Sequence, residues 1–208
     1  MEAIDYIPND NCTITSEMEI FDISFYKDKD YFVSLENYVA FIKGCEKLVR
    51  SSDEYTSFIS QLKEIDLVNC QVLGNVAADD NVSIEMHHGP ILTLFDYCAI
   101  IIDYHLRKNE KINSFMIANE VIDEHFANRV QTVMLSKTVH QLVDTGKIFI
   151  NFKQARGDLN GFLQKYKSGL SDEHIRKINK YIELSEKYDS TDNGLLDLKN
   201  TITSWKFK

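Results

Sequence analysis

Two separate segments of the chain carry side chains that can bind a metal ion. His87 and His88 are adjacent in VSIEMHHGP, where a run of alternating apolar residues ends before Gly-Pro. His140 and Asp144 are four residues apart in KTVHQLVDTG, a spacing that puts both side chains on one face of a helix. Imidazole and carboxylate are ligands for Zn²⁺, Mn²⁺ and Ni²⁺, and hold the harder ion Mg²⁺ more weakly. Together the two segments can supply three metal ligands and leave one histidine free.

Each of these residues also has a purely structural interpretation. A His-His pair at a strand end is more often incidental than catalytic, and His140 can be a core histidine bonded to a backbone carbonyl. Asp144 can be an ordinary residue of a last helical turn. The helix dipole disfavours a carboxylate at that end, however, and a bound cation would offset the cost. This cost makes a cation partner for Asp144 more favourable. Together with the shared helical face of His140 and Asp144, it favours a metal site.

The elements that must position these residues are short strands and one short helix. Residues 82–86 alternate in hydropathy and predict a strand, paired as a hairpin with a strand at 67–76 across the turn AADDN. Residues 130–135 predict another strand that leads directly into the helix of KTVHQLVD, which Gly146 closes in the C′ position. Residues 147–152 predict a further strand.

The remainder of the chain has mostly helical periodicity, after short strand-like pieces at 20–26. The predicted helices cover residues 35–49, 53–65, 93–108, 113–129, 171–188 and 195–208. Their expected N-caps are Ser52 or Asp53, Thr93, Asn113 or Ser114, and Ser171.

Composition limits the classes of function. The 208 residues carry 23 Lys and Arg against 32 Asp and Glu, a net charge of −9. This balance disfavours a protein that coats nucleic acid non-specifically, because phosphate contacts need concentrated positive charge. Cys12, Cys45, Cys70 and Cys98 contain no C-x-x-C pair, so we expect reduced thiols and neither a zinc knuckle nor a disulfide framework. We expect no signal peptide and no membrane span, and hence a soluble cytoplasmic protein.

Two stretches resemble the HNH nuclease motif. VQTVMLSKTVHQLVDTGKIFIN is similar to the second half of that motif, and IEMHHGP is similar to its first half. The overlapping stretches HHGPILTLFD and KTVHQLVDTGKIFIN also resemble HNH-like proteins encoded by bacteriophages. The resemblance implies an α+β protein with a ββα-metal core at residues 69–152, interrupted by a helical insertion at 91–128. Residues 1–68 would form an N-terminal helical or mixed extension, and residues 153–208 a C-terminal helical extension.

The resemblance also implies a role for individual residues. By this resemblance, the metal ligands would be His87, His140 and Asp144. The general base would be His88, and Gln131 or alternatively Asn128 would take the place of the central Asn of the motif. Ser136 and Val139 stand where other members have knuckle cysteines, so no structural zinc is expected. His125, just before the second half of the motif, is a minor further candidate.

The implied function is a metal-dependent endonuclease that hydrolyses phosphodiester bonds in DNA in the host-cell cytoplasm. The ion would stabilise the developing charge on phosphate, while a neutral imidazole would take a proton from water. The alternative is an HNH-derived phage protein without catalysis, whose acidic surface binds a protein partner. The sequence leaves the identity of the metal and the oligomeric state open.

Overall fold

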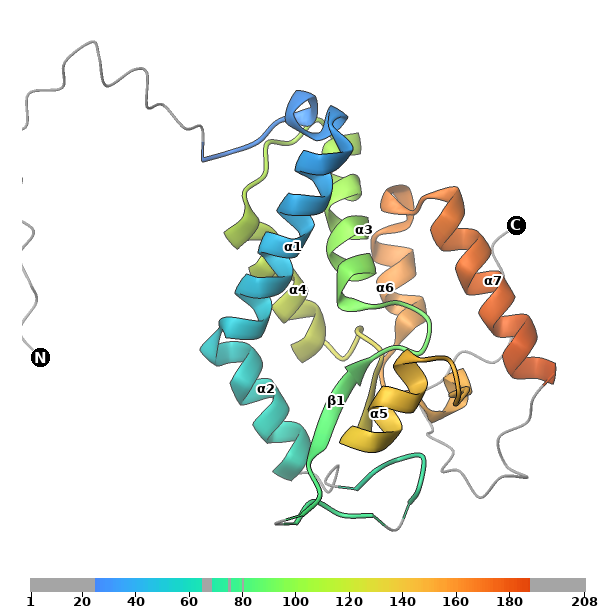
Figure 1. Ribbon diagram of the computed structural model, residues 1–208. Coiled ribbons are helices and arrows are strands. Elements are labelled where there is room, and N and C mark those ends of the chain that lie inside the picture. Colours follow the sequence, from blue (N-terminus) through green and yellow to red (C-terminus); the bar gives the residue numbers. More distant parts are fainter. Residues whose placement is uncertain (1–24, 65–68, 75, 80, 188–208) are drawn as a thin grey trace, which may run out of the picture.

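The chain folds into helices and one small antiparallel sheet (Figure 1). The structure is a computed structural model that describes residues 25–64, 69–74, 76–79 and 81–187. Within these residues the α-helices are α1 (Leu35–Ser51), α2 (Asp53–Glu64), α3 (Leu94–Arg107), α4 (Ser114–Phe126), α5 (Lys137–Asp144), α6 (Leu159–Lys165) and α7 (Asp172–Lys187). The strands are β1 (Ile84–His88) and β2 (Thr132–Ser136), and short 3-10 helices lie at η2 (Lys29–Val33), η3 (Phe152–Gln154) and η4 (Lys167–Gly169). This mixed content agrees with the expected α+β class.

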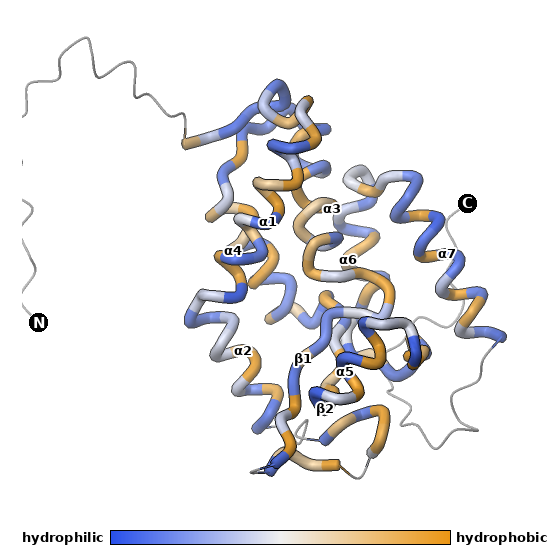
Figure 2. Tube along the Cα trace, in the orientation of Figure 1, coloured by the Kyte–Doolittle hydropathy of each residue, from blue (hydrophilic) through white to orange (hydrophobic). Residues whose placement is uncertain are grey.

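Helix α3 lies at the centre of the larger hydrophobic core. Thr93 caps it in a reciprocal arrangement with Asp96, and the consecutive residues Ile100, Ile101 and Ile102 are all fully buried. A helix that is apolar on nearly every side must be enclosed, and α1, α4, α6 and α7 surround it (Figure 1). Figure 2 shows α3 largely in hydrophobic colours and the peripheral α7 largely in hydrophilic ones. None of the described helices is long and apolar enough to cross a membrane.

The sheet and α5 form a second, smaller packing unit. Strand β1 pairs with β2 antiparallel, with Ile84 opposite Ser136 and His88 opposite Thr132. Helix α5 begins at the residue after β2, folds back and contacts both strands. Val133 and Leu135 of β2 pack there with Val139 of α5. In sequence, α3 and α4 lie between the two strands, and they belong to the larger core.

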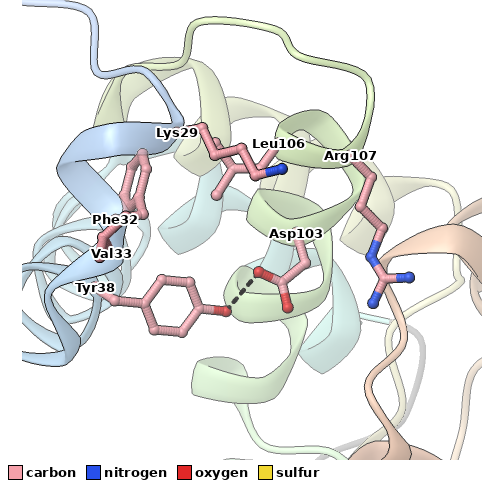
Figure 3. Close-up of a pocket in the computed structure, with 7 residues that line it drawn as sticks. All are labelled: Lys29, Phe32, Val33, Tyr38, Asp103, Leu106 and Arg107. Carbon is pink, nitrogen blue, oxygen red and sulfur yellow. Dashed lines mark hydrogen bonds between the residues drawn. The ribbon is translucent and has the colours of Figure 1, made fainter.

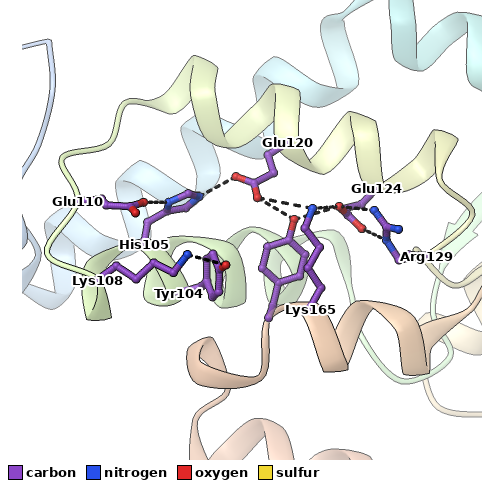
Figure 4. Close-up of polar contacts among 9 residues, drawn as sticks. Tyr104, His105, Lys108, Glu110, Glu120, Glu124, Arg129 and Lys165 are labelled. Carbon is purple, nitrogen blue, oxygen red and sulfur yellow. Dashed lines mark hydrogen bonds and ion pairs between the residues drawn. The ribbon is translucent and has the colours of Figure 1, made fainter.

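A network of charged side chains ties α3, α4 and α6 together (Figure 4). Glu124 of α4 is fully buried and accepts hydrogen bonds from Arg129, Lys165 and the hydroxyl of Tyr166. Burial alone would raise the pKa of Glu124, but these hydrogen bonds outweigh it and lower the pKa below its ordinary value. Glu124 is therefore a paired, ionised group inside the helical core.

The predicted hairpin between residues 67–76 and 82–86 is wrong, because β1 pairs with β2 instead. Among its described residues, the earlier segment forms a turn in which the Gly74 N–H donates to the Cys70 carbonyl. Gln71 then occupies the free edge of β2. Its N–H donates to the Met134 carbonyl, and its side-chain oxygen accepts from the Met134 N–H. Cys70 and Val72 of this segment are buried in the smaller core, whereas Leu73 is exposed.

The predicted strand at residues 147–152 is also absent from the structure. Asn151 instead caps η3, where its side chain accepts from the Lys153 N–H, and the Ile150 carbonyl accepts from the Tyr181 hydroxyl. Ile150 and Phe152 are buried, so apolar content correctly predicted burial but not the backbone conformation. Helix α6 was not predicted, because its seven residues are too short for a clear periodicity.

The predicted strands at 82–86 and 130–135 and the longer helices are confirmed as β1, β2, α1, α2, α3, α4 and α7. The caps Ser52, Thr93, Asn113 and Ser171 each accept a hydrogen bond from the first turn of their helix. The short helix is confirmed as α5, with Gly146 at φ +69° after its end. The helix predicted at 195–208, Cys12 and most of the segment 20–26 lie outside the described residues.

Candidate metal centre

His87, His140 and Asp144 lie together at the junction of β1 and α5. One donor atom from each falls within 4.8 Å of the other two. His87 Nδ1 is 3.8 Å from Asp144 Oδ1, and His140 Nε2 is 3.7 Å from Asp144 Oδ2. Two ligands of a tetrahedral ion, each ~2.0–2.1 Å from the metal, are about 3.3 Å apart, so the most widely separated donor atoms would have to approach one another by up to about 1.5 Å to coordinate one ion. We call these residues the His87–His140–Asp144 group.

The path of the chain explains why these residues meet. His87 points to one face of β1, and α5 folds back across that face immediately after β2 ends. One helical turn separates His140 from Asp144, so both face the strand. The chain then leaves β1 through Gly89 at φ +151°, where a Cβ atom would lie 2.9 Å from His87 Nε2. Only glycine leaves the imidazole room and also tolerates this backbone conformation.

Glu85 is a further member of the site that the sequence reasoning missed. It precedes His87 by two residues, which places both side chains on the same face of β1. The Nδ1–H of His140 donates to Glu85 Oε2 over 2.8 Å, and this bond turns Nε2 of His140 toward Asp144. Carboxylates commonly hold metal-binding histidines in this way. The strand alternation around His87 was the signal that could have identified Glu85.

The electrostatics of the group suit a cation. Burial, followed by the neighbouring His140, lowers the pKa of His87, although Asp144 opposes the shift, so the imidazole of His87 is neutral at neutral pH, the form that can bind a metal. Asp144 is the last residue of α5, where the helix dipole disfavours a negative charge. In the described part of the chain, no Lys or Arg pairs with Asp144 or Glu85. A bound cation would therefore supply the positive charge that the protein does not provide.

The donor set and its exposure also fit a reactive metal site. Two imidazoles and one carboxylate suit Zn²⁺, Mn²⁺ or Ni²⁺ better than Mg²⁺, which prefers oxygen ligands. The side chain of His87 is 14% exposed, that of His140 24% and that of Asp144 58%. Three protein ligands that open to solvent on one side leave coordination positions for water or substrate.

The structure does not bring His88 to this group, contrary to the expectation for a general base. Adjacent strand residues point to opposite faces, and His88 is buried between β1, α2 and α4. Its Nε2 lies 2.9 Å from Nε2 of His125 and 3.5 Å from the Tyr55 hydroxyl. The Nδ1–H of His125 donates to the Val121 carbonyl, so His125 Nε2 must accept the proton of His88. His88 and His125 thus form a buried pair of neutral imidazoles.

Gln131 is fully buried, and both polar atoms of its side chain lack a hydrogen-bond partner among the described residues. It lies one residue before β2, where its carbonyl accepts from the Gly89 N–H and its own N–H donates to the Tyr97 hydroxyl. The rival residue Asn128 is already engaged, because its side chain accepts a hydrogen bond from Arg156 Nε. Of the two amides, Gln131 has the unused hydrogen-bonding capacity.

A separate cavity of about 370 Å³ lies between η2, α1 and α3, and none of the His87–His140–Asp144 group lines it (Figure 3). At its floor the Tyr38 hydroxyl donates to Asp103 over 2.9 Å, and Lys29 and Arg107 extend along its rim. It contains none of the residues that the sequence singled out.

Comparison with known proteins identifies one relationship. A protein-family model described as Bacteriophage G278-like virion protein matches residues 1–204. No curated protein and no solved structure matches the chain.

Proposed function

Because the chain belongs to the family of bacteriophage G278-like virion proteins, we propose that it is a component of the phage particle that hydrolyses DNA phosphodiester bonds at a divalent-metal site. The observation that carries this proposal is the His87–His140–Asp144 group, with its imidazole donors, carboxylate and solvent-exposed side. The phage origin that accompanied the HNH resemblance is borne out by the family. The nuclease activity and the HNH relationship remain parts of the proposal.

The order of the elements around the group supports this choice of chemistry. Two antiparallel strands followed by a helix carry one ligand on the first strand and two on the helix, the ββα arrangement implied by the HNH resemblance. A divalent ion held there would stabilise negative charge on a phosphodiester and lower the pKa of water. The protein residues would hold and orient the ion, with Glu85 fixing the imidazole of His140.

His88 is not assigned the role of general base in this proposal. Its imidazole is buried on the other face of β1, and the proton on Nε2 is directed at His125. A base must reach the proton that it removes, directly or through one water, and the structure gives His88 no such access. Gln131 keeps the role of a positioning amide, supported by the unused hydrogen-bonding atoms of its side chain.

The proposal is tested by metal binding and plasmid nicking with the full chain. Calorimetric titration with Mn²⁺, Zn²⁺, Ni²⁺ and Mg²⁺ comes first, followed by nicking with each ion that binds. We expect His140→Ala and Asp144→Asn to abolish both binding and nicking. Asp123→Asn serves as the matched control, because Asp123 is exposed on α4 and distant from the ligands in the chain. Wild-type nicking by the double variant His87→Ala, His140→Ala would refute the proposal.

A binding role without catalysis is the second candidate, favoured by a cluster of exposed aromatic residues. Phe25 stacks on Phe115 with ring centroids 5.9 Å apart and contacts Tyr26 at 5.6 Å, and all three side chains are at least half exposed. Exposed apolar clusters commonly mark protein interfaces. If this role is the correct one, Phe115→Ser reduces incorporation into particles, whereas Phe126→Ser, at an exposed residue elsewhere on α4, does not.

A further inference from the structure

A second cavity lies on the other flank of α5 from the His87–His140–Asp144 group. Its volume is about 410 Å³, and Ser136, Lys137 and Thr138 line it at the beginning of the helix. Val82, Leu142 and Ile148 provide apolar walls. In α5, Thr138 and Leu142 share one face and His140 and Asp144 share another, so the helix separates the cavity from the metal ligands. This volume is in the usual range for a small-molecule site.

The beginning of α5 has hydrogen-bond donors that the protein leaves unused. Ser136 occupies the N-cap position, yet its side chain makes no capping hydrogen bond. The Lys137 N–H donates to the Ser83 carbonyl over 3.1 Å, but the N–H groups of Thr138 and Val139 have no acceptor in the described part of the chain. Ser136 is only 6% exposed and lines the cavity, and its hydroxyl makes no hydrogen bond among the described residues. The hydroxyl and the two amide N–H groups are therefore available to a ligand in the cavity.

The charge at this place also indicates an anion. Lys137 is the first residue of α5, where the helix dipole already provides positive charge, and the first turn contains no acidic residue. Lys137 is exposed and forms no ion pair among the described residues. The nearby Asp79 carboxylate is occupied by the N–H groups of Asn81 and Val82 and does not line the cavity. An anion at the mouth would relieve the repulsion between Lys137 and the helix dipole.

We propose that this cavity binds a phosphate monoester whose organic part lies against the apolar walls, as in a nucleoside 5′-monophosphate. The Ser136 hydroxyl, the amides of Thr138 and Val139 and the ammonium group of Lys137 provide enough donors for the three terminal oxygens of a phosphate. A phosphate monoester carries nearly two negative charges and a carboxylate only one, so the ammonium group and the helix dipole favour the phosphate. The same group can come from a free nucleotide or from the 5′-phosphorylated end of a nucleic acid. The site is independent of the proposed nuclease activity.

The direct test is a nuclear magnetic resonance titration of the ¹⁵N-labelled full chain. Adding a nucleoside 5′-monophosphate should shift the amide signals of Thr138 and Val139 saturably, and the parent nucleoside should not. A short oligonucleotide with and without a 5′-phosphate distinguishes the source: shifts that require the phosphate identify a nucleic-acid end. Binding of the free nucleotide alone identifies a small-molecule site.

Variants assign the binding to the residues concerned. Ser136→Ala removes no capping bond, so it should leave folding intact and weaken binding roughly tenfold, the effect of one hydrogen bond to a charged group. Lys137→Gln should weaken binding to a similar extent, whereas Lys63→Gln on α2 should not. His140→Ala should bind the phosphate normally, which separates this site from the metal group. The proposal is overturned if nucleoside and nucleotide shift the two amides equally, or if Ser136→Ala binds as wild type.

Discussion

At the scale of single residues, the orientation of His140 depends on Glu85. The carboxylate of Glu85 accepts the Nδ1 proton of His140 and leaves Nε2 of the ring available as a metal donor. We expect Glu85→Gln to weaken metal binding by roughly tenfold to a hundredfold, as loss of such a carboxylate usually does. Calorimetric titration with Zn²⁺ and Mn²⁺ measures this, with Glu54→Gln on α2 as a control. Equal affinities of Glu85→Gln and wild type would show that the hydrogen bond is irrelevant to the metal.

The individual residues also show how far sequence reasoning reached. His87, His140 and Asp144 could be grouped because residue type and helical spacing suffice once a strand and a helix are assumed. Strand alternation alone would have placed His88 on the face opposite His87, but its partners His125 and Tyr55 are far away in the chain and could not be predicted. That contact depends on the packing of α2 and α4 against β1, which no local pattern encodes.

At the scale of elements, glycine-to-alanine substitutions at the end of α5 and in the interior of α1 should have opposite effects on stability. Gly146 has φ +69°, and the N–H groups of Gly146 and Lys147 bond back to Val143 and Leu142, so the helix ends in a left-handed cap. A Cβ atom at Gly146 would meet nothing within 4 Å, so Gly146→Ala costs only backbone strain, about 1 kcal/mol of unfolding free energy.

The matched control for this prediction is Gly44 in the middle of α1. A Cβ there also meets nothing within 4 Å, but the backbone is helical, so Gly44→Ala should stabilise the protein by about 0.5–1 kcal/mol. Urea unfolding of both variants measures the change in unfolding free energy, which we expect to be a decrease for Gly146→Ala and an increase for Gly44→Ala. If both substitutions lowered the unfolding free energy, the space around Gly44 would be smaller than the structure indicates.

The elements also show which level of the fold could be predicted. Helices with a cap and several turns of apolar periodicity were found, because both signals are local. The partner of β1 was not, since the nearest β-branched segment along the chain competes with β2, which lies beyond two helices. Strand pairing depends on which strand edges the tertiary structure brings together. The predicted hairpin paired the segment of Gln71 with β1, whereas Gln71 forms hydrogen bonds with Met134 at the edge of β2.

At the scale of the whole molecule, the buried His88–His125 pair joins β1 to α4 beneath α2 and makes stability depend on pH. Burial lowers the pKa of His125 to about 4, with Arg50 acting in the same direction, and it also lowers the pKa of His88. A histidine whose folded pKa lies below its unfolded value of about 6.5 favours the folded state above that pH. This contribution is lost as the pH falls, because the unfolded chain then binds protons that the folded chain excludes.

For His125 alone this linkage amounts to about 2 kcal/mol between pH 7.5 and pH 5. His105 acts in the opposite direction, since the hydrogen bonds that it donates to Glu120 and Glu110 raise its pKa, so the pH dependence of wild-type stability combines both effects. The informative quantity is therefore a difference between proteins. Urea unfolding at pH 7.5 and pH 5 measures how much the free energy of unfolding falls on acidification. We expect a smaller fall in His125→Gln than in wild type, and a larger fall in His105→Gln. Parallel pH profiles for wild type and His125→Gln would mean that the pair is open to solvent in the native state, and His88 would then regain the access that a general base needs.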